Sequence, residues 1–189
     1  MPDHYVLRVA TRRGDLHLIW RLGEGNDHDT LAVDDGRRLL AFHEAEALQG
    51  HCERKGWDLV ADAESVLDLE EVRESIEEAA RDPRARTVPT GLLLDAWNFF
   101  EDLARSVDAP TALPAQGAVH DAAYDRFFDA ADGGVWSDEE AAAAWGLLRA
   151  GLDVWEEAVR DAVVPDAALL TRTALLTRTT ESARSVPPS

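Results

Sequence analysis

The chain contains very little of three residue types, with one cysteine, one methionine and one lysine among its 189 residues. The single cysteine, Cys52, cannot form an internal disulfide, so the sequence is not that of a disulfide-stapled secreted domain. The N-terminus does not combine basic residues with an apolar run, as a secretory signal peptide would. We therefore expect a cytoplasmic protein that is held together by its hydrophobic core.

Long apolar runs are also missing. The most apolar stretch, 92–103, is interrupted by Asp95, Asn98, Glu101 and Asp102. A helix that spans a membrane needs about 20 predominantly apolar residues, so four polar interruptions in twelve positions argue against one. We expect no contact with the interior of a membrane.

Motifs for metal, nucleotide or nucleophile chemistry are missing as well. The six histidines have no metal-binding spacing, and His51 and Cys52 are neighbours on an expected helix, where their side chains diverge by about 100°. No glycine-rich phosphate loop and no G-x-S-x-G elbow is present. The Asn-Asp-His-Asp loop at 26–29 lacks the glycine and the final glutamate of a calcium loop. We expect neither a metal nor a cofactor.

Acidic residues are abundant, with 37 acids against 19 bases and a formal net charge of −18. Residues 58–82 hold ten acids against two bases, and residues 119–161 hold eleven against three. This field repels the phosphates of nucleic acids and anionic lipids, and it favours a basic protein partner. The alternative is that the acids form solvated helix faces that keep the protein in solution.

The first forty residues contain four segments in which apolar and polar positions alternate, as in half-buried strands. These segments are 5–10, 16–22, 30–33 and 38–42. Gly14 and the Asp35-Gly36 pair supply turn residues between them. The period then changes to that of a helix from Glu44, which Gly56 ends. Residues 57–60 form either a short fifth strand or a segment that packs the Trp57 ring on this helix.

The second half of the chain has helical periodicity. Helices are expected at 68–81, 90–107, 119–128 and 137–160. Asp68 and Ser137 stand three residues before a glutamate, as in a capping box, and Thr90 can cap its own helix. The 90–107 helix is apolar on most of its surface, so we expect the other elements to pack around it.

These elements predict an α+β fold with an N-terminal antiparallel β-meander and one helix, followed by a mostly helical C-terminal half. We expect one domain over residues 1–165, sheet-rich in 1–61 and helical in 66–162. Residues 166–189 repeat L-L-T-R-T at a period of six and end S-V-P-P-S, which predicts a weak helix and a disordered tail.

Two sets of residues are candidates for function. Partner binding is expected from tryptophans at element boundaries and from acids on helix faces, namely Trp57, Glu70, Glu74, Glu77, Glu78, Trp136, Asp138 and Glu139. Asp95, Asn98 and Asp102 follow one line of the 90–107 helix, beside Arg105, and form a polar site if that line faces a cleft rather than solvent.

Three segments carry a resemblance to a known group of proteins. They are G-R-R-L-L-A-F at 36–42, E-A-E-A-L-Q-G-H-C at 44–52 and L-L-D-A-W-N-F-F-E-D-L-A-R-S at 93–106. With the meander before them and the acidic helical half around them, they resemble small acidic cytoplasmic proteins of GC-rich bacteria, among them immunity proteins of polymorphic toxin systems. The resemblance covers about the first 160 residues. It implies a non-catalytic protein that binds a cognate toxin and blocks its active site.

Three hypotheses follow. The first is an acidic protein-binding module of immunity or antitoxin type that inhibits a basic toxin or enzyme. The second is a small hydrolase or transferase with a carboxylate site between sheet and helices. The third is a regulatory or scaffold subunit that self-associates through the helix containing Trp145 and Trp155. The absence of a catalytic constellation favours the first.

Overall fold

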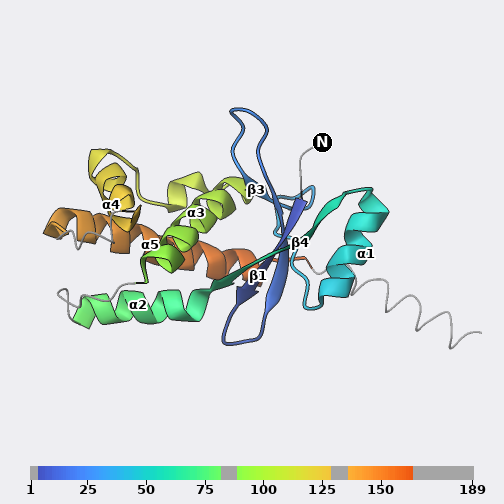
Figure 1. Cartoon of the computed structure of the whole chain (residues 1–189), viewed down its shortest axis with the longest axis horizontal. Coiled ribbons are helices and arrows are strands. Elements are labelled where there is room, and N and C mark those ends of the chain that lie inside the picture. The colour runs from blue at the N-terminus through green and yellow to red at the C-terminus, as the bar shows by residue number, and fades with distance from the viewer. Residues whose placement is uncertain (1–3, 82–88, 129–135, 164–189) are drawn as a thin grey trace, which may run out of the picture.

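The computed structural model describes residues 4–81, 89–128 and 136–163. Within them the chain has an α+β fold, in which a four-stranded sheet stands between one helix and a group of helices (Figure 1). The predicted fold class is confirmed. The expected tail at 166–189 lies outside the described residues.

The sheet has the strand order β3-β2-β1-β4. Its strands are β1 (His4–Ala10), β2 (Leu16–Arg21), β3 (Thr30–Leu31) and β4 (Leu59–Asp68). The first three are antiparallel neighbours, as predicted, whereas β4 lies parallel to β1 and makes the sheet mixed. The segment 57–60, which the sequence left undecided, therefore contains the start of β4, a strand of ten residues.

The strand expected at 38–42 is not a regular strand. Leu39, Leu40 and Phe42 each make an isolated bridge, to Val33, Val163 and His17 respectively. The left-handed turn position also differs from the prediction, because it is occupied by Arg37, with φ of 62°, and not by Gly36. The Asp34 carboxylate fixes this geometry by accepting hydrogen bonds from the backbone N–H groups of Gly36 and Arg38.

The helices agree closely with the expected ranges. They are α1 (Ala45–Lys55), α2 (Leu69–Arg81), α3 (Thr90–Ser106), α4 (Ala118–Phe128) and α5 (Asp138–Arg160), with a 3₁₀ turn, η1, at Pro110–Ala112. Ser137 and Glu140 form the predicted capping box, and Asp68 accepts from the N–H groups of Glu70 and Glu71. Thr90 is the first residue of α3 and not its cap.

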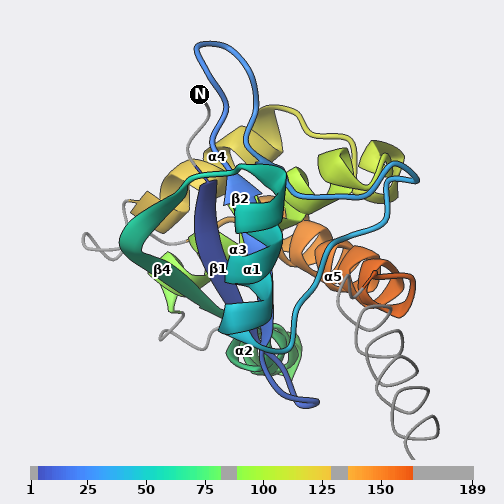
Figure 2. The same ribbon diagram turned by 90° about the vertical axis from the view of Figure 1, so that its right-hand side faces the viewer.

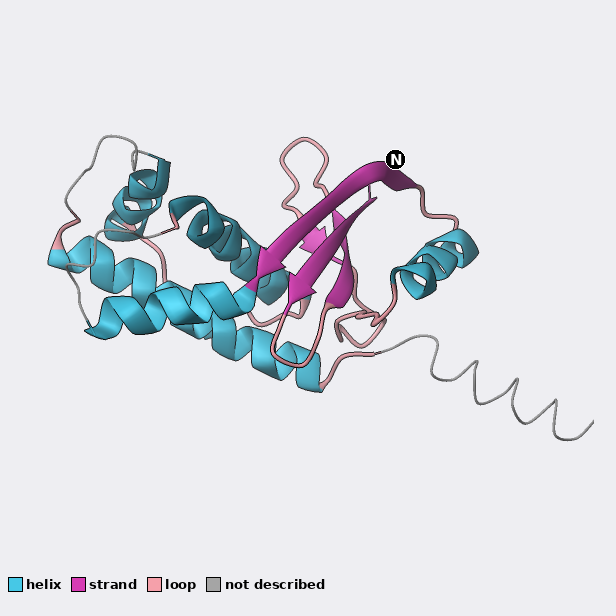
Figure 3. Cartoon of the chain, turned by 60° about the horizontal axis from the view of Figure 1, so that its bottom comes forward, coloured by secondary structure: helices cyan, strands magenta, loops and turns pink. Residues whose placement is uncertain are grey.

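The two faces of the sheet have different covers. Helices α2, α3 and α5 share one hydrophobic cluster with one face, and α4 packs on α3 and α5 (Figure 1). We call this the bundle face. Helix α1 lies across the other face (Figures 2 and 3) and buries Ile19, Leu40 and Phe42 against Leu48 and Cys52. We call this the α1 face.

Helix α3 is the centre of the bundle-face core, as predicted. Trp97, Phe100 and Leu103 have almost no exposed surface. Helix α5 crosses α3 at Gly151, where an added Cβ would lie 2.2 Å from carbons of the Phe100 ring, so the glycine permits the close approach. No described helix is long and apolar enough to cross a membrane.

Candidate functional site

The polar line of α3 lies beside the sheet, and its residues become more buried from Asp95 to Asp102. Asp102 is only 5% exposed, Asn98 is half-buried and Asp95 is exposed. Because α3 has apolar residues on most of its surface, the sheet and the other helices must enclose it on nearly every side. The helix thereby presents two carboxylates and an amide to the space beside the strands.

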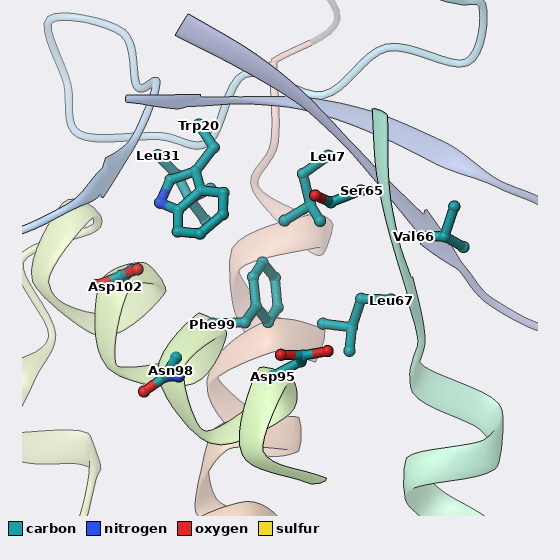
Figure 4. Close-up of a pocket in the computed structure, with 10 residues that line it drawn as sticks. All are labelled: Leu7, Trp20, Leu31, Ser65, Val66, Leu67, Asp95, Asn98, Phe99 and Asp102. Atoms are coloured by element: carbon teal, nitrogen blue, oxygen red, sulfur yellow. The ribbon is translucent and has the colours of Figure 1, made fainter. Parts of the chain in front are cut away.

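A cavity of about 140 Å³ lies in that space, between α3 and the sheet (Figure 4). Its polar lining residues are Asp95, Asn98, Asp102 and Ser65, and its apolar walls include Leu7, Trp20, Leu31, Leu67 and Phe99. In Figure 4, Asp102 lies on the side of the Trp20 ring, and Asp95 on the side of Leu67. The structure thus brings the three residues of the predicted polar site together in one cavity.

A second hollow, of about 390 Å³, adjoins the first and shares Trp20, Asn98 and Asp102 with it. Its far wall is the loop after β2, which contributes Asp27, His28 and Asp29, and α3 adds Glu101 and Arg105. We call the two hollows together the acidic groove. Five carboxylates line it against one arginine, so the groove attracts cations and repels anions.

Burial dominates the electrostatics of Asp102. The pKa of its carboxyl group is raised to about 6, chiefly because burial penalises the charged form. Arg105 opposes the rise, since its Nη2 donates to Asp102 Oδ1, whereas the charges of Asp29 and Glu101 add to it. Burial also raises the pKa of Asp95. Near neutral pH, Asp102 is mostly ionised but can take up a proton readily.

The arrangement limits what chemistry the groove can perform. Asp95 and Asp102 are two helical turns apart, about 10 Å along the axis, so they would act separately and not as a close carboxylate pair. The hydroxyl of Ser106 is engaged, since it donates to the backbone oxygen of Asp102 and accepts from the N–H of Leu31. Asn98 is fixed by Tyr124, whose hydroxyl donates to its Oδ1.

Other possible reactive groups are in less suitable surroundings. Cys52 lies on the side of α1 that is buried against the sheet, and burial raises the pKa of its thiol to about 11, so the nucleophilic thiolate is scarce at neutral pH. In the described parts of the chain, no group of three or more His, Cys, Asp or Glu side chains is arranged to hold a metal ion.

The acids predicted on α2 divide into two kinds. Glu70 pairs with Arg12, and Glu77 pairs with Arg81, so part of their charge is neutralised locally. Glu74 and Glu78 are exposed, and no ion pair to another described residue is seen for either. Glu74 and Glu78 therefore contribute most of the uncompensated charge of the predicted set on this helix.

Helices α2 and α5 pack side by side and run in opposite directions (Figure 1). Arg73 of α2 donates to Glu156 of α5 at 2.7 Å, and Asp153 and Glu157 are exposed nearby along α5. The predicted Asp138 and Glu139 are exposed in the first turn of α5, at the end farthest from the sheet. The two acidic segments of the sequence thus meet where α2 and α5 lie side by side.

The tryptophans at element boundaries are packed rather than free. The Trp57 ring stacks on His4 with centroids 5.0 Å apart, and Trp136 lies against Phe127 and stacks on Trp145. Both rings are half-buried, which leaves part of each for a partner. Trp155, on the helix considered for self-association, is buried against Phe99 inside the chain.

The sequence did not indicate several residues of the groove. Trp20, Asp29 and Glu101 line the groove, and none of them was among the predicted site residues. They meet because the loop after β2 lies against a helix that follows about 70 residues later. A short-range pattern contains no signal for such a contact.

No protein-family model, no curated protein and no solved structure matches the chain.

Proposed function

We propose that the chain is a non-catalytic, acidic protein-binding module of immunity or antitoxin type, which acts in the bacterial cytoplasm and inhibits a basic toxin or enzyme. The observation that carries this proposal is the meeting of the two acidic segments on the neighbouring helices α2 and α5. A surface with many exposed carboxylates and few bases attracts a basic partner from a distance and orients it before contact.

The exposed acids contribute unequally to this attraction. Glu70 and Glu77 each face an arginine of the same chain, so they gain little by exchanging it for a partner's base. No such pairing with a described residue is seen for Glu74 or Glu78, and the two lie four residues apart, about one turn of the helix. The proposal therefore assigns the main steering role on α2 to Glu74 and Glu78.

A binding experiment with the product of the neighbouring gene tests the proposal. We expect co-purification, protection from its toxicity, and association at least about tenfold slower for Glu74→Lys/Glu78→Lys at low salt. The matched control, Glu46→Lys/Glu53→Lys, makes the same change of charge on the exposed side of α1. Association that is equally fast in both variants, or insensitive to salt, would contradict the electrostatic role of α2.

The second candidate is the small hydrolase or transferase with a carboxylate site. It is favoured by one observation, namely that Asp102 has a pKa of about 6 and lines a cavity between sheet and helix. On this alternative, Asp102→Asn abolishes a measurable turnover of ester, amide or glycoside substrates and leaves partner binding unaffected. Absence of turnover of these substrates by the parent chain would contradict this alternative.

A further inference from the structure

A third hollow, of about 480 Å³, opens on the α1 face, where β1 begins and β2 ends. The strand register builds its floor. His4 is paired with Arg21 on the next strand, and Arg21 with Thr30 on the third. Directly paired residues of antiparallel strands point to the same side of a sheet, so these three side chains form one row. Arg21 is two residues beyond Ile19, which is buried under α1, so the row lies on the α1 face.

Helix α1 does not cover this row. Its buried residues, Leu48, His51 and Cys52, lie over the cluster of Ile19 and Phe42 farther along the sheet. The chain leaves the helix at Gly56 and places the Trp57 ring flat against His4, with 7° between the ring planes. The stacked rings form one wall of the hollow, and the turn containing Arg37 forms another.

The charge of this hollow is opposite to that of the acidic groove. Arg21 and Arg37 both line it, and Asp58 is the one acid among the described residues around it. Neither arginine forms an ion pair with a described carboxylate, whereas Arg37 Nη1 lies 3.4 Å from a neutral acceptor, the backbone oxygen of Ser106. In a chain with a net charge of −18, two arginines at one cavity that pair with no described carboxylate are unexpected for surface charges alone.

The backbone at Arg37 points in the same direction. Its φ of 62° lies in the left-handed region, which costs a residue with a side chain roughly 1 kcal/mol or more. A glycine is next to it in the sequence, yet the arginine takes the strained position and extends into the hollow wall. Strained residues of this kind are concentrated at ligand sites, where the side chain and not the backbone is needed.

We propose that this hollow binds a small anion with a phosphate or carboxylate group, which the guanidinium groups of Arg21 and Arg37 hold together with the Thr30 hydroxyl. Planar guanidinium groups match the oxygens of both kinds of anion and form charge-assisted hydrogen bonds with them. The stacked ring of Trp57 offers an aromatic edge or face to any ring that the anion carries. The site is independent of the partner-binding surface on α2 and α5.

Titration of the full chain with inorganic phosphate, citrate and adenosine monophosphate, followed by backbone amide NMR shifts, tests the proposal. At least one probe should give saturable shifts at Thr30 and Trp57, with a dissociation constant of about 1 mM or lower. Arg21→Ala and Arg37→Ala should each weaken binding about tenfold, the loss expected for one charge-assisted hydrogen bond. Stronger binding of the adenosine compound than of phosphate would assign a role to the Trp57 ring.

The control is Arg149→Ala, which removes an exposed arginine of α5 outside the hollow and should leave the affinity unchanged. Thermal unfolding of each variant verifies that the fold is kept. The proposal is overturned if no probe gives saturable shifts, or if Arg21→Ala, Arg37→Ala and Arg149→Ala bind equally well. Either result would mean that Arg21 and Arg37 are ordinary surface charges and do not form an anion site.

Discussion

The two faces of the sheet are covered very differently. The bundle face meets three helices with large apolar side chains, and the acidic groove opens beside Asp95 and Asp102. The α1 face meets one helix of eleven residues, which leaves the end of the sheet open beside Arg21 and Arg37. The hollows therefore lie where the helices do not fully cover the sheet. Side chains alternate between the two faces along a strand, and this alternation determines which charged residues line each hollow. Trp20 lines the acidic groove, and the next residue, Arg21, lines the hollow on the opposite face that also contains Arg37.

The tightest packing on the bundle face should be the least tolerant of change. Gly151→Ala would place a Cβ 2.2 Å from the buried Phe100 ring and should lower the free energy of unfolding by about 3 kcal/mol. Gly146→Ala is the control on the same helix, because its Cβ would meet no atom within 4 Å. It should raise stability by about 0.5–1 kcal/mol through helix propensity. Urea denaturation of both variants measures the difference, and equal effects would contradict the close crossing of α3 and α5.

The next effect concerns the cavity that the bundle face leaves open. The raised pKa of Asp102 means that the folded chain keeps a proton that the unfolded chain releases at lower pH. The contribution of Asp102 to stability should therefore fall as the pH rises from about 4 to about 6, and stay level above that window. Asp102→Asn should remove this fall and stabilise the fold by about 2 kcal/mol at pH 7.5.

Urea denaturation at pH 4 and pH 7.5 tests this expectation. Asp95→Asn is the control, since Asp95 lines the same cavity but is exposed, and its substitution should have a smaller effect. Equal stability of Asp102→Asn and the parent at both pH values would contradict this expectation. It would mean that the ion pair with Arg105 offsets the whole free-energy cost of burying the Asp102 carboxylate.

The smallest effect belongs to the α1 face. Arg37→Gly should stabilise the chain by about 0.5–1 kcal/mol, because glycine takes the left-handed backbone without strain. Gly36→Ala should be nearly neutral, because Gly36 does not have a positive φ. A large loss of stability from Gly36→Ala, without a gain from Arg37→Gly, would contradict this expectation. It would indicate that Gly36 occupies the left-handed position of the turn, as the sequence predicted.

Short-range patterns predicted the elements that are fixed by neighbours in the chain. The hairpin around Gly14, the end of α1 at Gly56 and the capping box at Ser137 follow from residues within a few positions of each other. Strand β4 was left undecided as a short fifth strand, and its length and place were not predicted, because they depend on pairing with β1, more than 50 residues earlier. The line of Asp95, Asn98 and Asp102 was identified, but its burial depends on where the sheet lies.

The bridge between Leu40 and Val163 has a consequence for synthesis of the chain. The backbone of Val163 bonds to Leu39 and Ala41, so a segment at the end of α5 completes the pairing of a segment from the first quarter of the sequence. These bonds cannot form on the ribosome until residue 163 has emerged. The segment 39–41 must therefore wait, without these bonds, through most of translation, and the net charge of −18 then reduces its tendency to associate with other nascent chains.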